Sequence, residues 1–185
     1  MVKIYISPLE SPFLPGYTGA KNKEKEHISM KYAIVYASLT GNTRLLAETV
    51  RDSLEGTPVW FGEADPRALE ADRIYVGFWT DRGSCDGATA EFLKTLTDQE
   101  VFLFGSAGFV EGDYPRQVLD RVRSQLDPRV KVVGTFFCQG RMPMSVRRRY
   151  EAMTDNPDAP RRIRNFDAAL SHPDSRDLQN LRAAL

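Results

Sequence analysis

The stretch YAIVYASLTGNTRLLAETVRDSL, residues 32–54, decides the fold because it joins a strand, a polar loop and a helix. Residues 32–37 form a run of six largely apolar side chains, as in a buried strand. After the loop at 38–43, apolar side chains recur at a helical spacing, at Leu45, Leu46, Val50 and Leu54. Backbone N–H groups and hydroxyls converge at such a loop, where the helix dipole is positive. The segment therefore predicts an anion-binding site.

The loop Ser38-Leu39-Thr40-Gly41-Asn42-Thr43 also indicates which anion it suits. It has neither the Gly-Lys-Ser/Thr ending of a P-loop nor the three glycines of a dinucleotide fingerprint. Without a lysine it suits a phosphate monoester better than a triphosphate with its magnesium ion. A plainer interpretation is that Thr40 or Asn42 caps a helix that begins at Thr43. One cap does not need four hydroxyl or amide side chains in six residues, so we favour the phosphate site.

Length and composition are those of one globular domain. The chain has 185 residues, of which 42% are hydrophobic and 27% charged. No apolar run approaches the ~20 residues of a membrane helix, and we see no secretion signal. Cys85 and Cys138 form neither a disulfide framework nor a metal-ligand pattern. We therefore expect a cytoplasmic protein with reduced thiols, no metal and no membrane association.

The basic residues are unevenly distributed along a chain whose formal net charge is zero. This balance argues against general nucleic-acid binding, which needs a basic excess. Five of the seven lysines lie within residues 1–31, and all 18 arginines follow. Residues 1–29 are also interrupted by prolines and glycines, so we interpret them as an extension outside the core domain at 30–185. A short β-hairpin arm that begins with VKIYI is the competing interpretation.

The remaining chain alternates strand and helix patterns. Further strands are expected at 58–61, 73–80, 100–104 and 130–137, with a helical turn at 66–71 and helices at 88–96 and 115–126. Beyond Pro143 the pattern is an irregular, arginine-rich helical tail. This alternation predicts an α/β three-layer sandwich with a five-stranded parallel sheet. Five strands with the first close to the N-terminus fit the doubly wound order 2-1-3-4-5.

In open α/β sheets, ligands bind outside the carboxyl ends of the strands. Three segments should therefore surround one crevice: 38–43, 79–87 and 105–114. The second offers the ring of Trp79 and the backbone of Gly83 and Ser84. The third is glycine-rich and carries Phe109 and Tyr114. Such a crevice would suit a flat aromatic cofactor with a polar edge.

The loop pattern resembles the phosphate loop of the flavodoxin family, [ST]-x-T-G-x-T, which Ser38, Thr40, Gly41 and Thr43 match. The resemblance extends over residues 31–185 through RIYVGFWTDRGSCDGATAEFL, FLFGSAGF and GTFFCQGRM. These look like a short-chain bacterial branch with VGFW-x-D-x-G and F-x-CQG motifs. The neutral net charge departs from most flavodoxins, which are strongly acidic. No tyrosine stands directly at the stacking position after the fourth strand.

This resemblance implies FMN as the cofactor and a set of residues that bind it. The implied residues lie in the three segments: Ser38, Leu39, Thr40, Gly41, Asn42, Thr43, Trp79, Thr80, Asp81, Arg82, Gly83, Ser84, Gly105, Ser106, Ala107, Gly108, Phe109 and Tyr114. The aromatic members would stack on the flavin, or pack inward. The bound cofactor carries the redox chemistry, so no residue is expected to be a catalytic acid or base.

The implied function is a monomeric electron carrier that passes electrons between a reductase and an acceptor protein. The alternative is a flavin-dependent NAD(P)H:quinone reductase, which usually needs an insertion and an oligomer. The sequence shows no such insertion. A phosphoacceptor receiver domain shares the fold, and Asp81 could end its third strand. That reading fails because Ala37 and Ser38 stand where it needs paired carboxylates.

Several other residues have a functional and a structural interpretation. Cys85 and Cys138 follow strand ends, where an electropositive loop could activate a thiol, but small buried thiols are the simpler expectation. His27 and His172 are peripheral. The arginines are either a solvated helix face or a docking patch for an acidic partner; they are Arg147, Arg148, Arg149, Arg161, Arg162 and Arg164.

Overall fold

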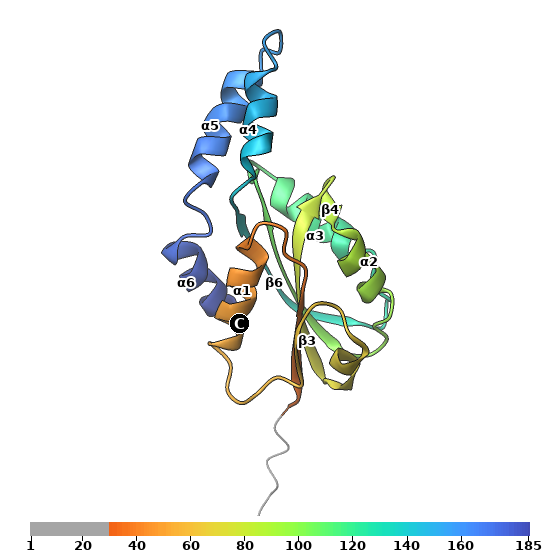
Figure 1. Cartoon of the computed structure of the whole chain (residues 1–185). Coiled ribbons are helices and arrows are strands. Elements are labelled where there is room, and N and C mark those ends of the chain that lie inside the picture. Colours follow the sequence, from red (N-terminus) through yellow and green to blue (C-terminus); the bar gives the residue numbers. More distant parts are fainter. Residues whose placement is uncertain (1–29) are drawn as a thin grey trace, which may run out of the picture.

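A computed structural model describes residues 30–185, and the predicted extension at 1–29 lies outside the described residues (Figure 1). The parallel strands are β1 (Tyr32–Tyr36), β2 (Trp60–Gly62), β3 (Arg73–Asp81), β5 (Glu100–Ala107) and β6 (Lys131–Gln139). They pair in the order β2-β1-β3-β5-β6. The two-residue strand β4 (Ser84–Cys85) pairs antiparallel with the end of β3. Counted without β4, this is the predicted order 2-1-3-4-5, which is confirmed.

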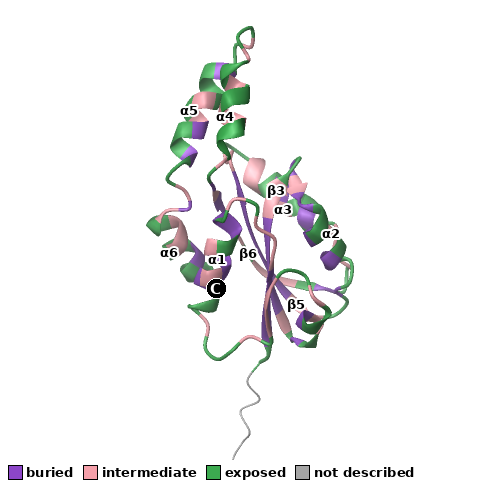
Figure 2. Cartoon of the chain, viewed as in Figure 1, coloured by how far each residue is buried: buried purple, intermediate pink, exposed green. Residues whose placement is uncertain are grey.

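Helices cover both faces of the sheet. On one face lie α1 (Asn42–Arg51) and α6 (Ser175–Ala184). On the other lie the 3-10 helix η1 (Pro66–Glu70), α2 (Gly87–Leu93) and α3 (Tyr114–Arg123) (Figure 1). Each face has its own apolar core: Leu46 and Leu181 belong to one, and Leu93 and Val118 to the other. The central strands are buried on both faces (Figure 2), as a parallel sheet requires. The predicted three layers are therefore present.

Strand β5 is longer than the sequence analysis expected. Gly105, Ser106 and Ala107 were assigned to a glycine-rich loop, but they continue the ladder opposite β6. The expectation failed because glycine usually weakens a strand. Here the ring of Phe78 occupies the space where a Cβ of residue 105 would stand, so glycine is the residue that fits. The loop proper begins only at Gly108.

The arginine-rich tail consists of three ordered helices. Helix α4 (Met144–Glu151) and helix α5 (Ala159–Ala169) form a hairpin that stands out beyond the carboxyl edge of the sheet (Figure 1). Most of its surface is exposed, while Phe166 is buried (Figure 2). Arg147 forms ion pairs with Glu151 and Asp167. The expected helical, arginine-rich character is present; the pairing of α4 with α5 was not predicted, because charged residues on most sides of these helices obscure the faces that meet.

Helix α6 returns the chain to the body and packs against α1. Its first turn is closed by a capping box: the Asp174 carboxylate accepts hydrogen bonds from the N–H groups of Arg176 and Asp177. The Asp177 carboxylate accepts in return from the N–H of Asp174, and it lies 2.6 Å from His172 Nδ1. His172 is thus part of a helix start, in agreement with its expected peripheral role. No helix within residues 30–185 combines the length and apolar character that a membrane span needs.

Candidate functional site

Two cavities open at the carboxyl edge of the sheet, and we call them together the cofactor cleft. Their volumes are about 480 Å³ and 330 Å³, and Leu39 and Trp79 line both. Several predicted residues meet there: Ser38, Leu39, Thr40, Asn42, Trp79, Thr80, Ser106, Ala107 and Gly108. Half-buried Trp79 contributes to both cavities, while Tyr36 and Tyr150 each line one of them.

The phosphate-loop candidate ends in a helix that lacks a side-chain cap. Gly41 occupies the N-cap position with φ of +85°, a left-handed conformation that favours glycine. Gly41 has no side chain to cap the helix, and the one side chain of the described residues that accepts from the first turn, Ser38, lies outside the N-cap position. The alternative that Thr40 or Asn42 caps this helix is therefore wrong. The first N–H groups of α1 have no partner within the helix and can bind an anion.

Two buried polar atoms of the first turn of α1 also lack partners among the described residues. They are Asn42 Oδ1 and Thr43 Oγ1. Asn42 is 5% exposed and Thr43 is 1% exposed. Since buried polar groups are nearly always hydrogen-bonded in proteins, two adjacent exceptions in one loop indicate a ligand that supplies the bonds.

Asn42 also fixes the shape of the loop. Its Nδ2 donates to Thr40 Oγ1 and to the carbonyl oxygen of Arg141, both at 2.9 Å. The backbone N–H of Arg44 donates to Ser38 Oγ at 3.2 Å. These bonds tie the loop to itself and to the segment after β6. The arrangement is therefore held in place before any ligand binds.

The segment after β3 is a tight β-hairpin rather than an open loop. Arg82 and Gly83 form its two-residue turn, and both have positive φ. The carbonyl of Gly83 accepts a hydrogen bond from Arg121 of α3, and Ser84 Oγ accepts one from Gln125. Of the predicted residues in this segment, Asp81, Arg82, Gly83 and Ser84 line neither cavity of the cleft. The Gly83 carbonyl and the Ser84 hydroxyl are thus engaged by α3 and by the residues that follow it.

The predicted aromatic residues after β5 lie apart from Trp79. Phe109 and Tyr114 pack edge to face, with ring centroids 5.7 Å apart. They line a separate third cavity rather than the cofactor cleft. Gly105 lies within the sheet, and Gly41 and Thr43 belong to the loop without lining a cavity.

The sequence analysis missed Glu63 and Ala64 after β2, and it missed a whole further wall of the cleft. This wall follows β6 and continues into helix α4: Arg141, Met142, Pro143, Val146, Arg149 and Tyr150. Because β6 also ends at the carboxyl edge, its following segment could have been predicted to join the site. The contribution of α4 could not, since it depends on how the hairpin is placed.

Comparison with known proteins now decides the family. A family model described as a flavodoxin domain matches residues 33–185. The chain belongs to the flavodoxin family. The family predicted from the sequence motifs is thereby confirmed.

The chain is also similar to two curated proteins, both named flavodoxin-like domain-containing protein BilS. The one from Clostridium symbiosum (strain WAL-14163) is 41% identical over 172 residues, which is 80% of this chain and 90% of that protein. The one from Clostridioides difficile (strain CD3) is 27% identical over 165 residues, with the same coverage of 80% and 90%. Among solved structures, oxidised Flavodoxin 2 from Bacillus cereus superposes with a TM-score of 0.50 at 20% identity. The match covers 76% of this chain and 97% of that one, and it supports the fold alone.

The two thiols of this flavodoxin-family chain are buried. Cys85 is 7% exposed and Cys138 is 6% exposed. Burial raises the pKa of both thiols above its ordinary value. The simpler expectation of small buried thiols is therefore confirmed, and because the thiolate is the reactive form, the raised pKa does not favour an activated cysteine.

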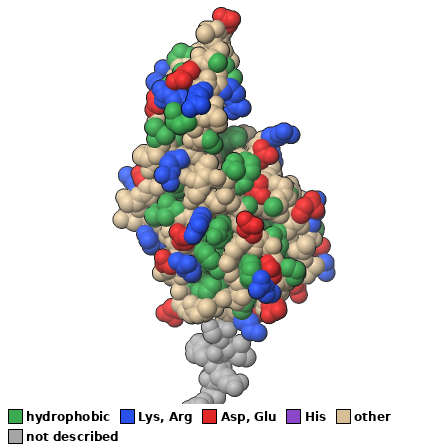
Figure 3. Space-filling model, in the orientation of Figure 1, with side chains coloured by type: hydrophobic (Ala, Val, Ile, Leu, Met, Phe, Trp, Pro, Cys, Tyr) green, Lys and Arg blue, Asp and Glu red, His purple; other side chains and the backbone are tan. Residues whose placement is uncertain are grey.

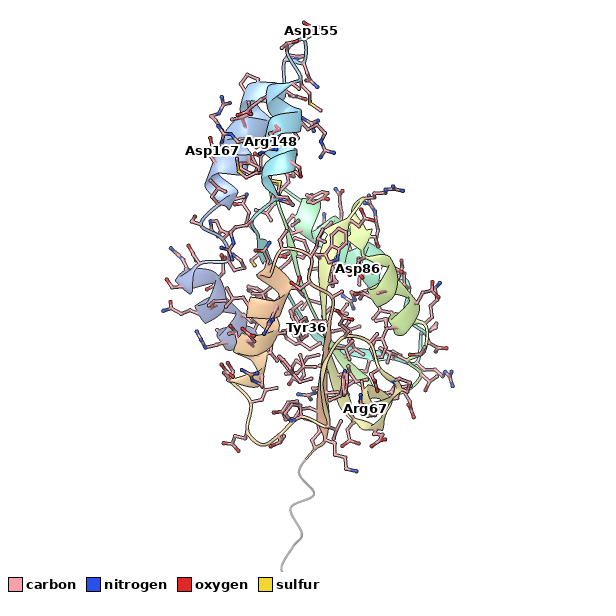
Figure 4. All side chains as sticks on the ribbon, in the orientation of Figure 1. Tyr36, Arg67, Asp86, Arg148, Asp155 and Asp167 are labelled. Atoms are coloured by element: carbon pink, nitrogen blue, oxygen red, sulfur yellow. The ribbon has the colours of Figure 1, made fainter. Side chains whose placement is uncertain are left out.

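One buried carboxylate lines the cleft, that of Asp86. It caps α2 by accepting hydrogen bonds from Thr89 N at 3.0 Å and Thr89 Oγ1 at 2.8 Å. Figure 4 labels Asp86 at the start of this helix. Its two acceptor oxygens are therefore engaged in holding α2 beside the cleft.

Proposed function

We propose that this chain binds FMN in the cofactor cleft and serves as an electron carrier between a reductase and an acceptor protein. The observation that carries the proposal is the phosphate loop. An uncapped helix N-terminus and two unpartnered buried polar atoms meet there. Membership of the flavodoxin family supports FMN as the cofactor. When bound, FMN supplies redox chemistry in one-electron or two-electron steps.

The residues of the cleft fit the parts of FMN. The first N–H groups of α1 and the hydroxyl of Thr43 are donors suited to phosphate oxygens. Asn42 Oδ1 is an acceptor suited to a ribityl hydroxyl, because its own Nδ2 is already engaged. Trp79 offers an aromatic face for the flavin ring. The chain thus provides binding and orientation, and the cofactor provides the electrons.

A flavin-dependent NAD(P)H:quinone reductase is the second candidate function. The hairpin α4–α5 favours keeping it, since residues of α4 add a wall beside the cleft that could take part in binding a second molecule. The carrier is preferred because Asp86, the buried carboxylate of the cleft, is committed to capping α2.

The first test is spectroscopic. The purified protein should be yellow, and denaturation should release a compound with the absorbance of free FMN. A colourless protein that also fails to take up added FMN would contradict both candidate functions. In a yellow protein, oxidation of NAD(P)H without an added reductase would favour the enzyme over the carrier.

The second test addresses the loop. Replacing Thr40 and Thr43 together (Thr40→Ala, Thr43→Ala) should weaken FMN binding by about tenfold or more, because two hydroxyls near the phosphate are lost. Thr57→Ala is the matched control, since Thr57 is exposed and remote from the loop. FMN fluorescence quenching measures each dissociation constant. Equal affinities in all three proteins would show that the phosphate binds elsewhere.

A further inference from the structure

A third cavity, of about 270 Å³, adjoins the cofactor cleft, and Tyr150 lines both. One wall is the loop after β5 with the first residue of α3, and the other is the hairpin α4–α5. The residues that line it are Phe109, Tyr114, Tyr150, Arg161, Arg162 and Asn165. The proposed binding of FMN in the cleft makes no use of this space.

Specific contacts hold the two walls of the third cavity together. Asn165 Nδ2 donates to the carbonyl oxygen of Gly108 at 2.7 Å. Gln139 Nε2 donates to the same carbonyl and to Asn165 Oδ1, both at 3.2 Å. Farther along the loop, Arg161 pairs with Glu111 at 3.0 Å. The cavity is therefore built into the junction between loop and hairpin.

The walls offer aromatic faces to a flat molecule. The rings of Phe109 and Tyr114 meet edge to face, and Tyr150 contributes a third ring. The Arg161 guanidinium lies 5.7 Å from the Phe109 ring centroid, and that of Arg162 lies 5.8 Å from the Tyr150 centroid. Aromatic side chains and guanidinium planes favour planar, unsaturated ligands.

The charges around the cavity favour an anion. Arg161 is balanced by Glu111 and Asp158, at 3.0 Å and 3.7 Å. Among residues 30–185, no carboxylate lies within ion-pair distance of Arg162. Its guanidinium is thus free to pair with a ligand.

The charge of the hairpin around the third cavity is also positive. Residues 141–169 carry seven arginines and four carboxylates, whereas the rest of residues 30–185 carries 14 cationic and 18 acidic side chains. Figure 3 shows several blue side chains close together on the hairpin, with others spread over the body. A basic protrusion on an otherwise acidic body raises the local concentration of anions.

We propose that the third cavity binds a planar organic anion, an aromatic ring system with a carboxylate or sulfonate group, and that Arg162 is its charged contact. The volume lies below the ~300–1,000 Å³ typical of drug-sized ligands, so the ring system is small. The shared residue Tyr150 places this ligand next to the cofactor cleft. Binding itself does not require that FMN be present.

Isothermal titration calorimetry of the full chain tests this inference, both as purified and after saturation with FMN. The probe is naphthalene-2-sulfonate, and 2-naphthalenemethanol is its uncharged counterpart. The wild-type chain should bind the sulfonate more tightly than the alcohol. Arg162→Gln should weaken sulfonate binding by about five- to tenfold, as expected for a lost charge-assisted contact. Arg164→Gln is the matched control on the same helix, because Arg164 does not line the cavity.

Three results would overturn the proposal. The first is absence of sulfonate binding, or equal binding of the sulfonate and the alcohol. The second is equal affinity of the wild-type chain and both variants. The third is binding that FMN saturation abolishes, which would assign the cavity to the cofactor. Binding that depends on Arg162 in a chain unable to take up FMN would support the inference while contradicting the proposed function.

Discussion

The two edges of the parallel sheet differ in whether their polar side chains have hydrogen-bond or ion-pair partners. At the amino edge, Arg73, Glu100 and Lys131 begin β3, β5 and β6 and stand side by side in register. Glu100 pairs with Arg73 at 2.5 Å and with Lys131 at 2.7 Å. At the carboxyl edge, Asn42 and Thr43 keep buried atoms without partners. Among residues 30–185, the charged groups at the amino edge satisfy one another, while these two atoms at the carboxyl edge remain available to a ligand.

The difference indicates that polar groups at the amino edge stabilise the fold and that polar groups at the carboxyl edge can bind a ligand. An unpartnered buried hydroxyl destabilises the free protein, so it persists where a ligand supplies the bond. An ion-pair network that spans three strands contributes to the folded state without any ligand. Substitutions at the two edges should therefore separate stability from binding.

The largest effect should come from Thr43→Val at the carboxyl edge. Valine keeps the shape of threonine and removes a buried hydroxyl that has no partner in the described part of the chain. FMN affinity should fall by about tenfold or more, because a hydrogen bond to a charged phosphate is lost. The thermal midpoint of the FMN-free protein should not fall. Fluorescence titration and thermal unfolding measure the two quantities. A variant that loses stability but keeps FMN affinity would show that Thr43 contributes to stability rather than to binding.

A smaller effect is expected from Glu100→Gln at the amino edge. Removing this charge breaks both ion pairs and should lower the thermal midpoint by a few degrees, with FMN affinity unchanged. Hydrogen bonds from Lys131 and Arg73 hold the pKa of the Glu100 carboxyl below its ordinary value. A lowered folded-state pKa contributes stability above the ordinary carboxyl pKa, and that contribution disappears as the pH falls through the lowered value.

The difference in thermal midpoint between wild type and Glu100→Gln should therefore be full near pH 7 and vanish in acid. Arg44 and Glu48 form an exposed ion pair on α1, so Glu48→Gln is the matched control and should change stability less. A difference that stays constant from neutral to acid pH would argue against the ion-pair explanation.

The smallest effect concerns the thiols. Iodoacetamide at pH 8 should leave Cys85 and Cys138 unmodified in the folded protein and modify both after unfolding, because burial raises their pKa and excludes the reagent. Mass spectrometry counts the added groups. Fast modification of either thiol in the folded protein would show that this thiol is accessible and reactive.

Much of the fold could be predicted because its strands are nearly continuous apolar runs. The run in β3 from Ile74 to Phe78 is buried on both faces. A continuous apolar run predicts such burial without any knowledge of the neighbouring strands. Strand β5 was predicted three residues short. Glycine fits the strand at position 105 because the ring of Phe78, on the neighbouring strand, occupies the space of a Cβ. Pairing between strands, which one strand's sequence does not show, decides such positions.

The candidate site divides in the same way. Ser38, Thr40 and Asn42 could be placed because loop and helix are adjacent in the chain, and local geometry brings their donors together. The order of the motifs along the chain could not show which cavity Phe109 and Tyr114 line, because the orientation of their side chains depends on contacts with the hairpin. Arg149 and Tyr150 lie more than 100 residues from the loop whose cleft they line.

The sequence by itself determined the strands of the sheet and the polar turn at 38–43, because apolar periodicity and local backbone geometry act over short stretches of chain. Only the tertiary structure decided that a basic hairpin stands over the carboxyl edge. It also separated the cofactor cleft from a third cavity at Tyr150. These features arise from contacts between distant segments, such as Asn165 with Gly108, whose energies no local pattern records.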